Sequence, residues 1–523
     1  MALAKVSLDP AVPDQEVSGH TALADSLPVS RTRALSLRQA YATVFTASAC
    51  TLIIELLAGR LMAPYLGVSL YTWTSIIGIV LAGMTAGNFV GGWLADRSAS
   101  RVLLSRIFLL AAATSGGLVA ISGVVFNAVS MWSMPVMVRI LIAATAVFFV
   151  PNFLLGTTTP QVVKLALRSL DNAGQTVGSI YGVSAFGSIV GTFASGFFLV
   201  DYVGTMRTLW LVSGVLLICG ILIRGRLGRQ VVVLLLMLFI GMPALSTSAT
   251  FDGPCEDETG YFCIRTVTRT LEDGSVVTDV VQDRLIHTTL KLDDPSFLGY
   301  GYETAYLRLS ESRLAGDAAT EHVLVIGGGG YAFPRYMTAT HPDIPVDVVE
   351  IDPGVVEFNH EHLKLPRDTP ITTHAEDARL FLNFHAPRET YSIVQLDAFN
   401  DVSVPYHLTT LEFARSVKQS MTADGVLMTN LVDIPTSGQF VQAYANTLRQ
   451  VFPHVTIYVP ADAGEARTTY VVVGSAQPVT TEIEGWTRIE GEALGERFPT
   501  RTDIILTDDF APTDRLLRPV VDD

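Results

Sequence analysis

The chain has 523 residues, of which 49% are hydrophobic, and a formal net charge of −15 at pH 7. This length allows two or three domains. Residues 1–248 hold 15 Lys and Arg against 8 Asp and Glu, whereas the other 275 residues hold 20 against 42. The acidic half argues against nucleic acid as a partner, because binding it requires a basic face. It suits a small cationic ligand, although acidity more often serves solubility alone.

Apolar runs dominate the basic half. Residues 1–38 carry Pro, Ser, Asp and Gly without hydrophobic periodicity, which predicts a disordered tail with no signal peptide. Several of the later runs reach the ~20 residues that cross ~30 Å of hydrocarbon. We therefore expect a transmembrane helical bundle over 39–248 with about seven spans, six or eight being the alternatives. The expected spans are 41–58, 73–94, 103–126, 136–156, 178–200, 208–223 and 230–248.

Basic residues lie mostly on one side of these spans. With the N-terminus inside, the inner segments hold eleven Lys and Arg, and the outer ones hold only Arg60, Arg139 and Arg207. Positive residues mark the cytoplasmic side. The pattern predicts a multi-pass inner-membrane protein whose C-terminal half, after seven spans, lies outside the cytoplasm.

Small residues recur at helical spacing within the spans. Gly83, Gly87 and Gly91 are four residues apart, as are Gly187 and Gly191. Missing side chains let helix backbones approach closely, so we expect tight helix packing at both stripes.

Two cysteines follow the last span. Cys255 and Cys263 flank the sequence CEDETGYFC. A metal site needs further ligands nearby, and the sequence offers none of the right type. A disulfide that closes a hairpin, in an oxidising compartment, is one interpretation, and two free thiols are the other.

The acidic half changes character twice. Residues 249–305 alternate polar and apolar side chains around the turn EDGS, which predicts a small antiparallel β domain. Strands and helices alternate over 306–523, which favours an α/β Rossmann-like domain built on a parallel sheet with helices on both faces, followed by a C-terminal extension. The expected strands are 322–327, 346–351, 392–397, 425–430, 454–459 and 469–474; the expected helices are 331–340, 353–362, 409–421 and 437–450.

Four consecutive glycines follow the first of these strands. Gly327 to Gly330 allow a tight turn and let backbone N–H groups approach a ligand. The spacing matches neither the dinucleotide fingerprint nor a phosphate-binding loop. Glu350 ends the next strand, where an acid can accept both hydroxyls of a ribose. The combination predicts a nucleoside site.

Two further acids follow strands. Asp377 in HAEDARLFL could accept a hydrogen bond from an adenine amine, and Asp397 ends the strand SIVQL. Each alone could be a surface carboxylate. Because open sheets bind ligands at the carboxyl ends of their strands, we expect both to join Glu350 in one site.

At these motifs the sequence resembles a known family. Residues 283–475 resemble spermidine synthase, and the whole chain is similar to the membrane-fused spermidine synthase-like proteins of bacteria, in the polyamine aminopropyltransferase family. The family reads Gly-Gly-Gly-Asp-Gly, Glu-Ile-Asp, Gly-Asp-Ala and Asp-Ser-Ser-Asp where this chain reads GGGGY, EID, EDA and DAFND. The resemblance implies a methyltransferase-type Rossmann fold and donor binding by these residues: Gly327, Gly328, Gly329, Gly330, Glu350, Asp377, His287 and Tyr302.

The resemblance also implies an activity. The family transfers an aminopropyl group from decarboxylated S-adenosylmethionine to putrescine and releases methylthioadenosine. A sulfonium is already an activated leaving group, so no metal is expected. The enzyme has to position donor and acceptor. Asp397 is then the base that takes a proton from the attacking amine.

The chain departs from the family pattern in two places. Gly330 and Tyr331 replace Asp-Gly in the turn, which removes a charge that would repel the carboxylate of intact S-adenosylmethionine by ~4 kcal/mol at ~4 Å and an effective dielectric of ~20. Asn400 takes the place of an acceptor-binding Asp, and Asp401 follows. We therefore expect either form of the donor. The acceptor is either an amine bound near Tyr331, Glu303 and Asp401, or the donor itself in an intramolecular, lyase-like or cyclase-like attack.

Two other functions stay open. A transporter or sensor would bind the nucleoside without catalysis, and a methyltransferase would transfer a different group. Asp397 favours an enzyme, because a pure binder needs no acid at the reacting carbon. The expected partners are a small-molecule donor, a polyamine and the lipid bilayer, with a homo-oligomer as an open alternative. Supply of S-adenosylmethionine favours a cytoplasmic site, against the loop charges.

Overall fold

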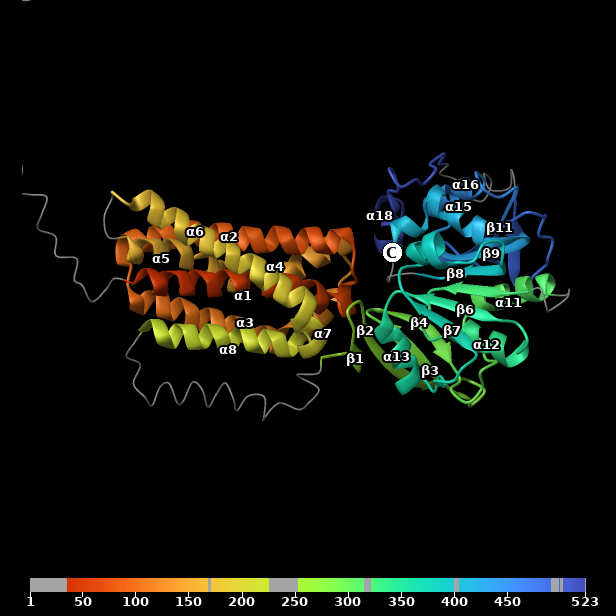
Figure 1. Cartoon of the computed structure of the whole chain (residues 1–523), viewed down its shortest axis with the longest axis horizontal. Coiled ribbons are helices and arrows are strands. Elements are labelled where there is room, and N and C mark those ends of the chain that lie inside the picture. Colours follow the sequence, from red (N-terminus) through yellow and green to blue (C-terminus); the bar gives the residue numbers. More distant parts are fainter. Residues whose placement is uncertain are drawn as a thin grey trace, which may run out of the picture.

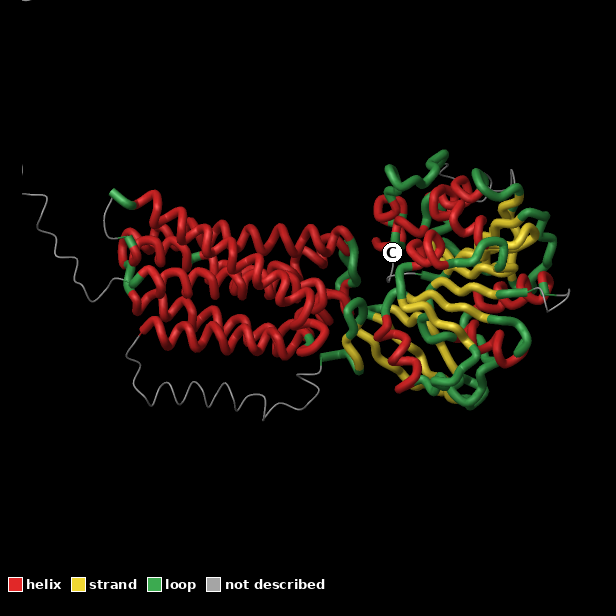
Figure 2. Tube along the Cα trace, in the orientation of Figure 1, coloured by secondary structure: helices red, strands yellow, loops and turns green. Residues whose placement is uncertain are grey.

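A computed structural model describes residues 35–167, 171–224, 253–314, 321–398, 404–490, 498 and 502–522. The molecule is elongated, with a bundle of long helices at one end and an α/β domain at the other (Figure 1). Figure 2 shows that the strands are confined to the second part.

Six helical segments among the described residues are long and apolar enough to cross a membrane. They are α1 (Leu37–Leu66), α2 (Leu70–Ser98), α3 (Arg101–Ser130), α4 with α5 (Val136–Gly156, Thr158–Ala166), α6 with the π-helical turn η1 (Ala173–Ala194, Ser195–Leu199) and α8 (Thr205–Arg224). Six of the predicted spans are thus found as helices, and the seventh, at 230–248, lies outside the described residues. Helix α1 begins before the first predicted span because Ser36 and Gln39 form a capping box.

The glycine stripes bring helices together as predicted. A Cβ on Gly87 of α2 would stand 2.2 Å from the carbonyl oxygen of Phe153 in α4, and one on Gly191 of α6 would stand 2.5 Å from that of Ala49 in α1. Since no side chain fits at either place, glycine permits these close contacts between backbones.

A small antiparallel sheet follows the bundle. Its strands, in spatial order, are β1 (Asp257–Glu258), β2 (Cys263–Thr270), β3 (Val276–Gln282) and β4 (Leu285–Leu290). This is the antiparallel unit that the sequence predicts within 249–305. A disulfide joins Cys255 to Cys263, so the loop before β2 is closed.

The large sheet has eight strands in the order β12-β10-β11-β9-β8-β5-β6-β7. Their bounds are β5 (Val323–Ile326), β6 (Val346–Glu350), β7 (Ile371–Ala375), β8 (Tyr391–Leu396), β9 (Met421–Asp433), β10 (His454–Pro460), β11 (Thr468–Ser475) and β12 (Trp486–Ile489). Strands β7, β6, β5, β8 and β9 are parallel, but β11, β10 and β12 pair antiparallel. The prediction of a wholly parallel sheet is therefore wrong at this edge. Residues 461–467 join β10 to β11 and are too few for a crossover connection.

Helices cover both faces of this sheet. They are α11 (Gly301–Arg313), α12 (Ala332–Thr340), α13 (Pro353–His362), α14 with η3 (Ala378–Leu380, Phe381–His385), η4 (Tyr406–Leu408), α15 (Leu411–Ser420), α16 (Gln439–Leu448), α18 (Thr513–Leu516) and α19 (Arg518–Asp522). Val323 and Val325 of β5 pack with α11 and α12, whereas Leu324 and Ile326 pack with α15 and α16. The alternation along one strand thus produces the predicted two-sided layer arrangement.

The α/β domain is joined to one end of the bundle. Arg60, near the end of α1, donates to the carbonyl oxygens of Thr259 (2.8 Å) and Gly260. Glu258 accepts from the backbone N–H of Thr205, the first residue of α8. Helix α1 begins at the other end of the bundle. The start of α1 and the α/β domain therefore lie at opposite ends of the bundle (Figure 1).

Candidate active site

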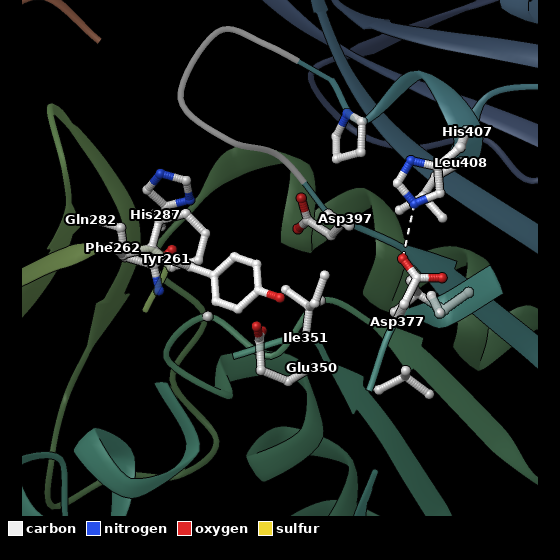
Figure 3. Close-up of a pocket in the computed structure, with 17 residues that line it drawn as sticks. Tyr261, Phe262, Gln282, His287, Glu350, Ile351, Asp377, Asp397, His407 and Leu408 are labelled. Carbon is white, nitrogen blue, oxygen red and sulfur yellow. Dashed lines mark hydrogen bonds and ion pairs between the residues drawn. The ribbon is translucent and has the colours of Figure 1, made fainter. Parts of the chain in front are cut away.

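A cavity of about 220 Å³ lies between the small sheet and the carboxyl edge of the large sheet. The small sheet contributes Gln282 and His287, and the large sheet contributes the segments that follow β5, β6, β7 and β8. Figure 3 shows Glu350, Asp377 and Asp397 around this one space. The carboxyl ends of neighbouring parallel strands meet at one edge, which is why the three acids come together.

The glycine turn shapes the floor of the cavity. Gly327 has a φ of +100°, and a Cβ on it would stand 2.2 Å from the carbonyl oxygen of Asp397. Gly329 has a φ of +49° and also lines the cavity. Only glycine combines these positive φ values with so close an approach between the ends of β5 and β8.

Glu350 is fixed by backbone donors. Its two carboxylate oxygens accept hydrogen bonds from the N–H groups of Gly328 (2.7 Å) and Asp352 (2.9 Å). Its side chain is buried, and this burial raises the pKa of the carboxyl group above its usual range. A carboxylate oxygen accepts more than one hydrogen bond, so Glu350 keeps capacity for ligand hydroxyls.

Asp377 shares its carboxylate between a helix and a histidine. One oxygen accepts from the backbone N–H groups of Arg379 and Leu380, which caps α14. The other lies 2.9 Å from Nε2 of His407, as the dashed line in Figure 3 shows. The sequence did not single out His407, which also lines the cavity.

Asp397 lies beyond the end of β8 and lines the cavity. Its Oδ1 accepts from Nδ2 of Asn430 at 2.9 Å, and the hydroxyl of Tyr302 also bonds to it. Burial raises the pKa of this carboxyl group. A carboxylate with a raised pKa and free access to a cavity is suited to accept a proton.

Glu303 lies near Asp397 but not among the residues that line the cavity. It is buried in the first turn of α11 and accepts from the backbone N–H of Tyr300 at 2.8 Å. Burial, together with the charge of Asp397, raises its pKa to about 7. Glu303 therefore titrates near neutrality close to the candidate base.

This titration should make stability depend on pH. Since folding raises the pKa of Glu303, the resulting stabilisation is present below pH 4.5 and is lost as the pH rises through 7. Raising a pKa from 4.5 to about 7 corresponds to about 3 kcal/mol. Thermal unfolding of the full chain at pH 5 and pH 8 should therefore show a smaller loss of stability at pH 8 for Glu303→Gln than for wild type. Equal losses in both proteins would contradict this role.

The remaining predicted residues lie in different places. His287 lines the cavity, burial lowers its pKa to about 4, and its Nε2 has no hydrogen-bond partner within the described parts of the chain. Gly330 donates its N–H to Thr288 at 3.0 Å and does not line the cavity. Tyr331 is fully buried, with its hydroxyl 3.1 Å from Thr373. Asp401 lies outside the described residues.

The disulfide loop forms a wall that the sequence did not reveal. Tyr261 and Phe262, just before Cys263, line the cavity. Behind them, Thr259 accepts from both of their N–H groups and donates its hydroxyl to Asp352, the residue that also contacts Glu350. Arg60 thus connects the bundle, through Thr259, to the wall of the cavity.

Opening the disulfide should weaken ligand binding. Cys255→Ser leaves Tyr261 and Phe262 on an open loop, whose ordering then opposes binding by ~1 kcal/mol, or about fivefold in affinity. Calorimetry with S-adenosylmethionine measures the affinity of this variant and of reduced wild type. The two affinities should be equal, because both proteins lack the disulfide. Cys219→Ser, which removes a free thiol in the bundle, serves as the control. Unchanged affinity in Cys255→Ser would show that the loop holds its position without the bridge.

Nowhere in the described ranges do three or more His, Cys, Asp or Glu side chains form a group that could hold a metal ion.

The fold defines the class of the α/β domain. A mixed sheet with a parallel core, a glycine turn after its first strand and a small antiparallel sheet beside it make up the fold shared by spermidine synthases and methyltransferases. The C-terminal half carries a spermine/spermidine synthase domain, whose family model matches residues 309–478.

Curated relatives agree with this match. The chain is 28% identical over 185 residues to a probable polyamine aminopropyl transferase of Bifidobacterium longum, covering 35% of this chain and 39% of that protein. It is 25% identical over 229 residues to a polyamine aminopropyltransferase of Vibrio vulnificus, covering 40% of this chain and 75% of that protein. A probable spermidine synthase structure from Corynebacterium glutamicum aligns with a TM-score of 0.43 at 16% identity, covering 49% of this chain and 96% of that one.

Proposed function

We propose that this protein is a membrane-attached, aminopropyltransferase-like enzyme that binds S-adenosylmethionine or its decarboxylated form and releases methylthioadenosine. The observation that carries the proposal is the single cavity in which Glu350, Asp377 and Asp397 meet. The names of the curated relatives support the same reaction class.

The proposal gives each carboxylate a role. Glu350 accepts hydrogen bonds from the ribose hydroxyls, and Asp377 with His407 binds the adenine. Gly327 and Gly329 leave room for the nucleoside beside the backbone. Asp397, which is hydrogen-bonded to Tyr302 of α11, is left for the reacting end of the donor.

The chemical step needs one base and one leaving group. An amine nitrogen attacks the carbon bonded to the sulfonium, that C–S bond breaks, and its electron pair stays on sulfur as methylthioadenosine leaves. The acceptor is an ammonium group at neutral pH, so it first gives a proton to Asp397, which frees the nitrogen lone pair for the attack. Asn430 and Tyr302 hold this carboxylate in place. The acceptor is an amine such as putrescine, or the donor itself in an intramolecular attack.

The cavity bears on the choice of donor. The described residues that line it include no Lys or Arg that could pair with the carboxylate of intact S-adenosylmethionine. The acid that the family places in the glycine turn is missing as well, because Gly330 stands at its position. A Cβ on Gly330 would stand 2.8 Å from the Cβ of Thr288. An Asp introduced there would displace Thr288, so the affinities of wild type for the two donors are the cleaner test.

A sensor or transporter is the second candidate. Arg60 joins the bundle to the cavity wall. A ligand in the cavity would therefore be connected to the bundle through this wall. A protein of this kind would bind the adenosyl ligand and leave it intact. Incubation with each donor, with and without putrescine, followed by mass spectrometry separates the two, because only the enzyme produces methylthioadenosine.

The side of the membrane can be tested with cysteine labelling. The α/β domain lies at the bundle end that holds Arg60, and the end with the N-terminus holds more cations: Arg38, Arg97, Arg101, Arg106, Lys164 and Arg224. We therefore propose that the domain faces away from the cytoplasm. In intact cells, Glu484→Cys should react with an impermeant thiol reagent, and Ser98→Cys should not. Protection of both positions would show that the domain lies on the cytoplasmic side of the membrane.

A further inference from the structure

Large apolar side chains are exposed around the mouth of the cavity. We call Tyr261, Ile351, Leu380, Phe384 and Tyr406 the rim. Phe384 is 74% exposed and Tyr406 is 55% exposed. Exposed apolar side chains that gather at one site, instead of lying singly, mark a surface that contacts something apolar.

The rim belongs to the cavity. Tyr261 and Ile351 line it directly. Leu380 and Phe384 lie in α14 and η3, which follow the cap residue Asp377, and Tyr406 precedes His407, the hydrogen-bond partner of Asp377. Whatever covers the rim therefore lies at the entrance used by the ligand.

The rim also lies on the side of the α/β domain that faces the bundle. At one end, Tyr261 follows Gly260, which accepts from Arg60 of α1. At the other end, Arg379 beside Leu380 pairs with Asp508, just ahead of α18. Figure 1 places α18 at the edge of the domain nearest the bundle.

The adjoining end of the bundle carries residues typical of a membrane interface. Met131, Trp132 and Met134, between α3 and α4, are exposed, and so is Tyr202, just before α8. Aromatic side chains gather at the headgroup level of a bilayer. The rim begins beside this end of the bundle, because Tyr261 follows Gly260, which accepts from Arg60.

We propose that the rim is seated in the headgroup layer of the lipid bilayer, so that the cavity opens onto the membrane surface and exchanges its ligand there. The partner is the phospholipid surface itself. The proposal relies on the proposed function only for the identity of the ligand.

Lipid contact can be measured with a fluorescent label. In the full chain with Cys50→Ala and Cys219→Ala, an environment-sensitive probe is attached at Phe384→Cys, Tyr406→Cys or Val276→Cys. Val276 is the matched control. It is an exposed apolar residue at the start of β3, opposite the last residue of β2, and so lies at the end of the hairpin that is remote from Arg60. Thermal unfolding of each labelled chain confirms that it is folded.

The proteins are placed in phosphatidylcholine vesicles with quenchers attached near the lipid headgroups, or with iodide in the water. Lipid quenching at 384 and 406 should exceed that at 276 by about threefold or more. Quenching by iodide alone would place the rim in water and overturn the proposal. Protection from both quenchers would mean that protein, such as the loop between α3 and α4, covers the rim, and would overturn it too.

This test needs no nucleoside. A negative result therefore leaves the proposed function standing, and a failure to bind nucleosides leaves the lipid contact standing.

Discussion

Asp397→Asn is expected to reduce methylthioadenosine release about 100-fold or more, the usual contribution of a general base. The amide keeps the shape of the side chain, and its oxygen can still accept from Asn430. It can neither take a proton nor attract an ammonium group. Turnover should therefore fall while nucleoside affinity stays within a few-fold, as measured by product release and by calorimetry on the same preparation.

Two outcomes would contradict this role. Parallel losses of stability, binding and turnover would make Asp397 a structural residue. Full activity would leave positioning alone to explain the rate, and would favour attack by a group that needs no deprotonation, such as the carboxylate of the donor itself.

Glu350→Ala is expected to weaken nucleoside binding about tenfold or more, because hydrogen bonds to a charged acceptor contribute roughly 1.5–3 kcal/mol. The substitution also frees the N–H groups of Gly328 and Asp352, so some loss of stability is expected as well. Calorimetry with S-adenosylmethionine measures the affinity of the folded fraction.

Asp433 offers a matched control for this experiment. It is a fully buried carboxylate that accepts from the backbone N–H groups of Ile434, Phe440 and Val441, and it does not line the cavity. Asp433→Ala should lose stability and keep the affinity of the folded protein. Equal affinity losses in both variants would remove Glu350 from the ligand site.

Much of the architecture could be predicted because simple periodicities determine it. Apolar runs of about 20 residues have few alternatives to a membrane helix. Buried strands such as β5 and β6 show up as short apolar runs, and acids placed just after them must gather at one edge of the sheet. Glu350, Asp377 and Asp397 were found in this way.

The missed features depend on contacts between distant segments. The antiparallel pairing of β10 with β11 is an exception, because the predicted strands 454–459 and 469–474 leave only nine residues between them, too few for a crossover connection. Tyr261 lines the cavity only because Arg60, Thr259 and the disulfide hold its loop there. Tyr331 stands in a motif position and yet fills the core, because the turn directs it toward Thr373.

Mass spectrometry of the purified full-length protein, mixed with S-adenosylmethionine or its decarboxylated form and with or without putrescine, tests the central claim most directly. The proposal predicts that wild type produces methylthioadenosine from at least one donor and that Asp397→Asn produces it at least about 100-fold more slowly. Release of S-adenosylhomocysteine, or recovery of both donors unchanged after prolonged incubation with wild type, would contradict it.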